Sequence, residues 1–227
     1  MHKNRNAAYG NTPAYGNTPA RTVRPVSPMR SASGRVVSAA STTGSFLLLI
    51  WVVQIVNAFS GERLIAFGIR PRDVEGMWGI LFAPFLHADF AHLIANTTVA
   101  AILLFLVALS GTRAVVISSV MTILIGGFGV WLFGQPYSVH VGSSILIYGW
   151  LAFLVVRGFF SGAIWQIILG VILAVAYSGM LWGVLPGQYG VSWQGHLFGG
   201  AGGVVAGWMN ASQARSERQK ERAMMRR

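Results

Sequence analysis

Long apolar runs, separated by short polar stretches, constrain this sequence more than any other feature. Only 10% of the residues are charged, whereas a soluble domain carries about a quarter. So few charged side chains could not cover the surface of a water-soluble globule. The runs therefore predict an all-α integral membrane protein that crosses a lipid bilayer several times. Six candidate spans can be placed, at about 45–60, 90–109, 114–133, 144–156, 163–185 and 196–210.

The apolar runs lie between two polar, basic ends. Residues 1–44 are rich in Ala, Gly, Ser, Thr, Pro and Arg, and they contain the sequence AYGNTP twice, at 8–13 and 14–19. This composition predicts a disordered basic tail. Residues 45–211 form the predicted membrane domain, and residues 212–227 a second basic tail that can extend the last span as a helix. The first long apolar run starts near Ser45, far from Met1, which disfavours a cleavable signal peptide.

The net charge of +11 comes mainly from these tails, because six basic residues precede residue 40 and six follow residue 214. A folded basic face for nucleic acid is therefore not indicated. Counted over alternate connections, one side of the membrane receives 14 Lys and Arg and the other receives three, Arg63, Arg70 and Arg72. The positive-inside rule then places both termini in the cytoplasm. With a simple six-span core, this pattern predicts a multi-pass protein of a bacterial plasma membrane.

Two of the candidate spans are too short to cross a bilayer. From Ser144 to Arg157 there are 13 steps, roughly 20 Å of helix, while the hydrocarbon core is about 30 Å thick. Only 14 steps separate His196 from Asn210 in the last span. With Arg157 at the cytoplasmic surface, Ser144 would lie about 10 Å below the outer surface. We therefore expect both helices to begin inside the membrane and to border a watery cavity.

Polar groups inside spans are costly and are functional candidates by default. Here they are His92 and Asn96 in the second span, Ser144 at the start of the fourth, and His196 at the start of the sixth. These three spans run in the same direction, so the four residues are expected on the same side of the membrane. A serine beside a neutral imidazole can perform acyl transfer. Because no Asp or Glu lies within a span, the prediction is a Ser–His dyad rather than a triad.

A tetrahedral intermediate also needs hydrogen-bond donors for its oxyanion. His92 and Asn96 are four residues apart and share one helix face. The backbone N–H groups of Ser143 and Ser144, at a helix N-terminus, could complete the oxyanion site. The chain has no cysteine, and no cofactor or metal is implied. We interpret His87 and His140 as histidines that brace loops.

Three motifs follow one another in the predicted membrane domain. They are His92-Leu-Ile-Ala-Asn96, then Gly142-Ser143-Ser144-Ile145 with Tyr148 four positions after Ser144, then His196-Leu-Phe-Gly199 and on to Gly203. Together they resemble the rhomboid intramembrane serine proteases, over about residues 45–210. The resemblance implies a six-transmembrane-helix rhomboid-like bundle with shortened fourth and sixth helices. It also implies an intramembrane serine endopeptidase that cleaves transmembrane protein substrates.

Carried over to this sequence, the resemblance implies roles for individual residues. Ser144 would be the nucleophile, His196 its base, and His92 and Asn96 the oxyanion donors. Tyr148 would pack against the His196 ring. Gly199 and Gly203 would let the sixth span approach the fourth closely.

One residue departs from the family pattern, because Ile145 stands where the second glycine of GxSG is usual. An isoleucine there could widen or shift the dyad. Ile145 thus favours an alternative, a catalytically inactive rhomboid-like protein that binds transmembrane segments. Haem or metal ligation by His87, His92 and His196 is a second alternative. A transporter is disfavoured, since no acidic residue lies within a span.

Overall fold

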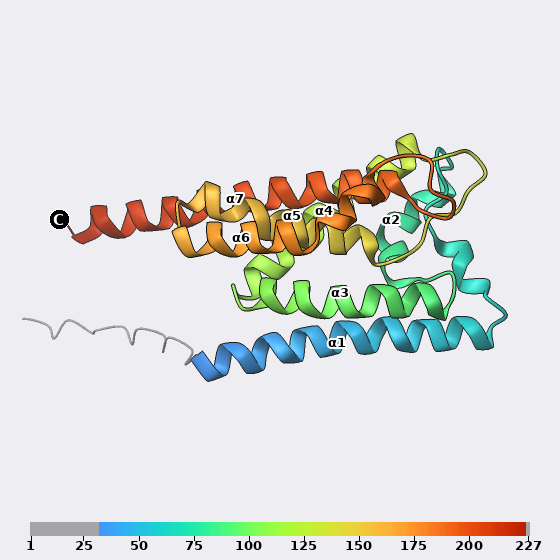
Figure 1. Ribbon diagram of the computed structural model, residues 1–227, viewed down its shortest axis with the longest axis horizontal. Coiled ribbons are helices and arrows are strands. Elements are labelled where there is room, and N and C mark those ends of the chain that lie inside the picture. Colours follow the sequence, from blue (N-terminus) through green and yellow to red (C-terminus); the bar gives the residue numbers. More distant parts are fainter. Residues whose placement is uncertain (1–31, 226–227) are drawn as a thin grey trace, which may run out of the picture. The chain divides into compact units, whose positions relative to one another are not determined.

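The computed structural model describes residues 32–225, without the side chains of 213–222. Within these residues the secondary structure is helical, apart from one isolated bridge between Ile69 and His140. The long helices, seen in Figure 1, are α1 (Ala32–Phe59), α3 (Phe90–Ala108), α4 (Thr112–Phe133), α5 (Ser144–Ser161), α6 (Ile164–Ala176) and α7 (Trp193–Met225). The short ones are η1 (Arg63–Phe67), η2 (Glu75–Trp78), α2 (Gly79–Phe82), η3 (Ala83–Phe85) and η4 (Ser178–Val184).

Four helices, α1, α3, α4 and α5, are long and apolar enough to cross a membrane. Together, α6 and η4 also qualify, with a bend of 67° between them, which gives up to five candidate spans in residues 32–225. The all-α membrane architecture is thus confirmed, whereas the count of six spans is not. The reason is α7, whose first half is rich in glycine and whose second half is polar.

Several helix ends differ from the predicted ones. Helix α1 begins at Ala32, so residues 32–44, expected in the disordered tail, are helical. The repeat at 8–19 lies outside the described residues. Helix α5 has 18 residues and α7 has 33, so neither is a shortened helix. Helical structure continues through the polar residues at these ends because only Pro, and to a lesser degree Gly, opposes it strongly.

Arg157, expected at the cytoplasmic surface, is buried inside the bundle. Its side chain is 4% exposed rather than solvated. The guanidinium donates a hydrogen bond to Ser110 Oγ and lies over the rings of Phe153 and Trp165. Aromatic faces and a hydroxyl can accommodate a buried guanidinium. Arg157 is therefore held by protein contacts, and the depth expected for Ser144 stays a prediction.

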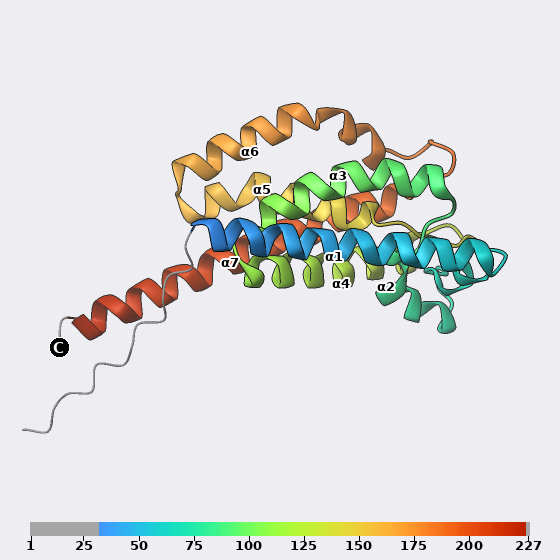
Figure 2. The ribbon, with the colours of Figure 1, turned by 90° about the horizontal axis from the view of Figure 1, so that it is seen from below.

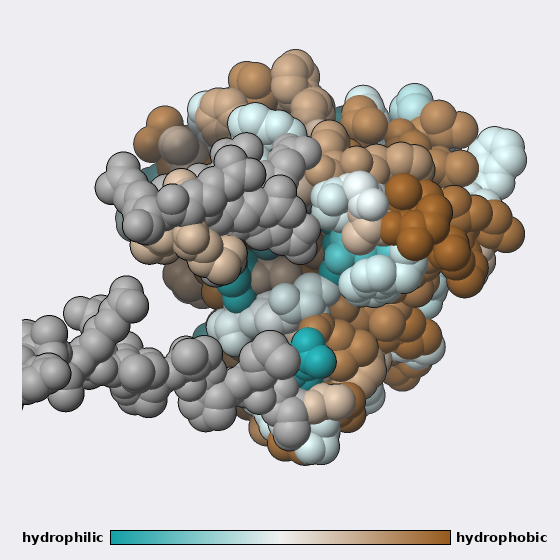
Figure 3. All heavy atoms as spheres, turned by 90° about the vertical axis from the view of Figure 1, so that its left-hand side faces the viewer, coloured by the Kyte–Doolittle hydropathy of each residue, from teal (hydrophilic) through white to brown (hydrophobic). Residues whose placement is uncertain are grey.

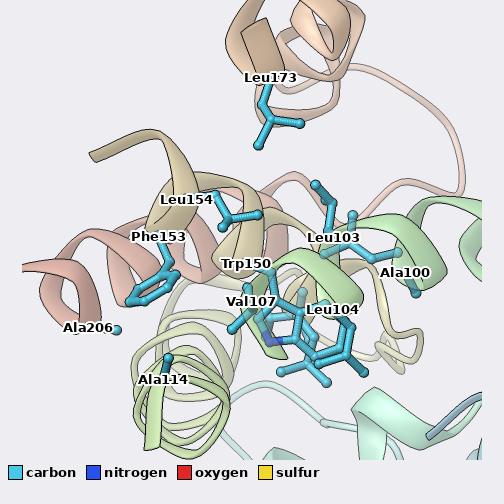
Figure 4. Close-up of a cluster of buried hydrophobic side chains, with 13 residues drawn as sticks. Ala100, Leu103, Leu104, Val107, Ala114, Trp150, Phe153, Leu154, Leu173 and Ala206 are labelled. Atoms are coloured by element: carbon cyan, nitrogen blue, oxygen red, sulfur yellow. The ribbon is translucent and has the colours of Figure 1, made fainter. Parts of the chain in front are cut away.

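The core lies around α5, which packs against α3, α4, α6 and α7. Figure 4 shows apolar side chains from all five helices gathered around α5, with Trp150 near the centre and Phe153 toward Ala206. Glycine permits a close approach between α5 and α7, because a Cβ on Gly203 would collide with the Gly149 backbone. This is the small-residue packing expected of membrane helices.

Helix α1 is attached mainly through α3, beside which it runs in Figures 1 and 2. Trp51 Nε1 donates to Thr97 Oγ1 across this contact at 3.1 Å. Helix α6 packs mainly on α5. Seen from the end where α1 begins, Figure 3 shows apolar residues gathered on the flanks of the bundle. Large apolar side chains of α1 and α6 are among the exposed ones, as expected for faces turned to lipid.

The connection between α1 and α3 is folded and reaches the end of α4. Arg70 Nε lies 2.6 Å from Asp73 Oδ2, an ion pair that lowers the pKa of that carboxyl. Trp131 Nε1 of α4 donates to the Asp73 carbonyl at 2.8 Å. Further along, the Ala83 carbonyl accepts the N–H of Gly142 at 2.9 Å. The connection thereby fixes the chain two residues before Ser144.

Candidate active site

Ser144 and His196 are brought together by the packing of α5 against α7. Ser144 is the first residue of α5, and His196 lies in the first turn of α7. Their Oγ and Nε2 atoms are 3.0 Å apart, within hydrogen-bond distance. The two residues expected to form a dyad are therefore in contact.

The His196 ring is held on its other sides by a backbone carbonyl and an aromatic ring. Its Nδ1 lies 2.8 Å from the carbonyl oxygen of Gly183. Since a carbonyl only accepts hydrogen bonds, Nδ1 carries the proton, and the Nε2 lone pair faces Ser144. Tyr148 stacks on the ring with centroids 4.0 Å apart and an interplanar angle of 10°. The Tyr148 hydroxyl donates to the Met180 carbonyl at 2.6 Å.

Gly142 brings His92 close to Ser144. Its φ of +125° favours glycine, and an added Cβ would lie 2.8 Å from His92 Nε2. The same Cβ position is 3.6 Å from Ser144 Oγ. The imidazole of His92 therefore occupies space beside the serine that only a glycine leaves open.

Asn96 supplies a free donor. Its side chain is 7% exposed, and Nδ2 is buried without a hydrogen-bond partner among the described residues. A buried donor left unpaired costs about 1–3 kcal/mol. Asn96 and His92 line the same cavity as Ser144, so this N–H is available to a group bound there.

The structure corrects the role expected of the Ser143 N–H. It points to His87 Nε2 at 3.4 Å, and Ser143 Oγ lies 3.2 Å from the same nitrogen. Burial lowers the pKa of His87 to about 3, so the ring is neutral and can accept. Ser143 therefore contacts His87 rather than the cavity. The Ser144 N–H lies in the first turn of α5, where backbone N–H groups have no acceptor within the helix.

The cavity in front of the dyad measures about 920 Å³. Two connections border it, residues 134–143 before α5 and residues 185–192 before α7. His140 joins them, with Nε2 2.9 Å from Ser138 Oγ and Nδ1 2.7 Å from Ser192 Oγ. Burial lowers the pKa of His140 as well. His87 and His140 both brace loops, in agreement with their interpretation from the sequence.

Ile145 is accommodated without separating the dyad. It is 5% exposed and lies between glycines of α4 and α7. A Cβ on Gly126 would come within 2.7 Å of Ile145 Cδ1, and one on Gly199 within 2.5 Å of the Ile145 carbonyl. In the family pattern a glycine at position 145 provides the space between the helices. Here Gly126 of α4 and Gly199 of α7 provide it instead.

Two features of the site were missed from the sequence. The carbonyls of Met180 and Gly183 hold Tyr148 and His196, and a backbone acceptor leaves no trace in the pattern of side chains. Gly126 was also not recognised as the partner of Ile145. In the described part of the chain, no three His, Asp or Glu side chains gather as a metal site would require.

Comparison with known proteins agrees with the resemblance seen in the three sequence motifs. The family model for the rhomboid domain matches residues 74–213. An uncharacterized protein of Mycobacterium tuberculosis (strain ATCC 25618 / H37Rv) is 41% identical over 212 residues, which cover 89% of this chain and 88% of that protein. An uncharacterized protein of Mycobacterium bovis matches to the same extent. One of Mycobacterium leprae is 41% identical over 182 residues, covering 77% of this chain and 72% of that protein.

The rhomboid match covers more than half of the chain and includes His92, Ser144 and His196. The resemblance drawn from the three motifs is therefore confirmed. The membrane-capable helices and this match agree on a multi-pass integral membrane protein. The chain belongs to the rhomboid family.

Proposed function

We propose that this protein is an intramembrane serine endopeptidase, with Ser144 as nucleophile and His196 as general base. The observation that carries the proposal is the 3.0 Å contact between Ser144 Oγ and His196 Nε2, with Nδ1 held by the Gly183 carbonyl. In that tautomer Nε2 can take the serine proton as Oγ attacks a peptide carbonyl. The same proton can then pass to the leaving amine. Water, deprotonated by Nε2, hydrolyses the acyl-enzyme and regenerates Ser144.

The oxyanion of each tetrahedral intermediate needs donors beside Ser144. Asn96 Nδ2 is buried and unpaired, and His92 lies against Gly142 within reach of the serine. The Ser144 N–H completes the group in place of the Ser143 N–H. Loss of one such donor typically lowers kcat about 10²- to 10³-fold. We therefore expect Asn96→Ala to remain folded and to lose activity on this scale.

The substrates we propose are single-span membrane proteins, because the chain lies in the lipid bilayer with them. An intact helix hides its carbonyls, so a substrate must unwind locally before a peptide bond can reach Ser144. The cavity can admit such an extended segment, and Ser138, His140 and Ser192 line it beside apolar residues. Such polar groups also allow water to be present for hydrolysis.

We propose six spans in a bacterial plasma membrane, with the bent α6–η4 pair as the fifth and α7 as the sixth. Both termini would then be cytoplasmic. The distribution of Lys and Arg supports this orientation. It places the cavity toward the outer leaflet, because α3, α5 and α7 all begin at that end.

The purified protein, reconstituted with a single-span test substrate, provides the experiment. We expect cleavage by wild type and none by Ser144→Ala. Ser143→Ala is the matched control, since it removes the adjacent hydroxyl, which contacts His87 instead of His196. Retained cleavage in Ser143→Ala and loss in Ser144→Ala would support the proposal. Folded wild type that binds the substrate without cleaving it would favour the inactive, segment-binding alternative.

A further inference from the structure

His196 lacks the acidic partner that orients the histidine of a catalytic triad. Among the described residues, its Nδ1 contacts the Gly183 carbonyl at 2.8 Å. A neutral acceptor can fix the tautomer of an imidazole as a carboxylate does, although with less electrostatic stabilisation. The orienting group is therefore a part of the backbone of η4.

A single turn of η4 holds both rings of the stack. The Met180 carbonyl accepts from Tyr148 Oη at 2.6 Å, and the Gly183 carbonyl contacts His196 three residues later. In a 3₁₀ helix there are three residues per turn, so carbonyls three apart point the same way. The 3₁₀ geometry, which follows the 67° bend after α6, thus aims two acceptors at the Tyr148–His196 pair.

Residue 183 also needs to be a glycine. A Cβ there would collide with Tyr148 Oη and lie 3.0 Å from His196 Nδ1. The requirement is steric rather than conformational, because Gly183 is not among the residues with positive φ. By contrast, a Cβ on Gly179, four residues earlier in η4, would have nothing within 4 Å.

We propose that Gly183 is a positioning residue for the reaction. Its carbonyl holds the His196 proton on Nδ1, and its missing side chain leaves room for the stack with Tyr148. This inference rests on the proposed protease function. It assigns the orienting role, which acidic residues fill in other serine hydrolases, to a backbone group.

The first experiment compares Gly183→Ala with Gly179→Ala in the purified full-length protein. We expect Gly179→Ala to match wild type in kcat, KM and the rate of labelling by a fluorophosphonate. Gly183→Ala should lower kcat and the labelling rate at least about tenfold, with KM within roughly twofold, because Gly183 itself is not among the residues that line the cavity. Equal kinetics for the two folded variants would overturn the inference and leave the proposed function standing.

A second variant tests the carbonyl itself without adding a side chain, because it replaces one backbone N–H by oxygen. Replacing Val184 by its α-hydroxy acid makes the Gly183 carbonyl an ester, which is a weaker acceptor. We expect kcat to fall roughly 3- to 10-fold. The same change at Gly179 weakens the Ser178 carbonyl instead and should leave kcat unaltered. Equal kcat values for both esters and wild type would count against the Gly183 carbonyl.

The histidine ¹⁵N spectrum tests the contact without turnover. The His196 signals are assigned by their loss in His196→Gln. We expect wild type to show a protonated Nδ1 and Gly183→Ala to show a mixture of tautomers. An identical His196 spectrum in both proteins would refute the positioning role. If wild type is neither labelled nor active, the protease function fails, and this spectrum still decides the role of the Gly183 carbonyl.

Discussion

At the scale of single residues, the site depends on small side chains that leave space for larger ones. Gly142 makes room for His92, Gly183 for the Tyr148–His196 stack, and Gly126 for Ile145. In each pair the glycine lies on a different element from the side chain it admits. A substitution at one member therefore changes the geometry of another element.

The Gly126–Ile145 pair gives a prediction about stability. Gly126→Ala places a methyl group within 2.7–2.8 Å of Ile145 Cδ1 and Cγ1. Overpacking of this kind costs about 1–3 kcal/mol. Ile145→Ala removes both clashing atoms, so the double variant should be less destabilised than the two single changes predict when added. Unfolding of the four proteins in one detergent measures the coupling. Additive effects would mean that Gly126 does not accommodate Ile145.

His87 gives a prediction about acid stability. Its pKa is about 3 in the folded protein and about 6.5 when unfolded. Between these values the unfolded state binds more protons, so the free energy of unfolding rises with pH. Protonation of His87 can remove at most about 5 kcal/mol as the pH falls through this window.

The measurement is the unfolding free energy of wild type and His87→Gln from pH 7 to pH 4. Glutamine keeps an acceptor for Ser143 and does not titrate, so the variant should lose less stability in acid. The other histidines are present in both proteins, so the difference between the two curves reports on His87, including its interaction with the His92 ring 5.2 Å away. Parallel curves for the two proteins would show that His87 does not carry this dependence.

The side chains with acid–base chemistry could be predicted from the sequence because their types and spacing are visible in it. Ser144, His196, His92, Asn96 and Tyr148 meet as expected. The direction of the Ser143 N–H could not be predicted, since it depends on the turn formed by Gly142 and on His87. The acceptors on η4 could not be predicted either, because any residue supplies a carbonyl.

At the scale of helices, contact between α5 and α7 sets the distance between the two dyad residues. Gly149 and Gly203 face each other across it, and Thr122 of α4 packs against the same region. Backbone atoms meet at this crossing, so a clash there cannot be relieved by rotation of a side chain.

We expect Gly203→Ala to be destabilised by about 1–3 kcal/mol and to lose activity, because α7 must move away from α5. Gly200→Ala is the matched control on the same helix, where an added Cβ has nothing within 4 Å. Thermal unfolding and cleavage assays of both variants make the test. Equal melting temperatures would mean that the crossing tolerates a side chain.

Helix positions followed from hydropathy, but helix ends did not. Apolar runs located α3 and α4 to within about two residues. Helices α1 and α7 continue into polar sequence, which hydropathy assigns to tails. The bend at Tyr177 was also missed, since no proline marks it. Its consequence is functional, because the bend turns η4 toward His196.

At the scale of the whole molecule, the six proposed spans can be tested by labelling introduced cysteines, because the chain has none of its own. Glu62, Tyr189 and Met224 are exposed in the described structure. Six spans place Glu62 and Tyr189 outside and Met224 inside.

We expect a membrane-impermeant maleimide to label Glu62→Cys and Tyr189→Cys on intact cells, and Met224→Cys only after lysis. The expected asymmetry follows from the concentration of Lys and Arg on one side. Labelling of Met224→Cys together with Tyr189→Cys on intact cells would mean that α7 does not span the membrane. The reverse pattern for all three sites would invert the topology.

The activation of Ser144 as a nucleophile can be measured by covalent labelling of the purified protein with a fluorophosphonate, with the adduct located by mass spectrometry. We expect one adduct on Ser144 in wild type, and none in Ser144→Ala or His196→Ala. Folded wild type that takes no label, in a detergent where an active rhomboid protease is labelled, would contradict the proposed role of Ser144. An adduct on Ser143 would contradict it as well.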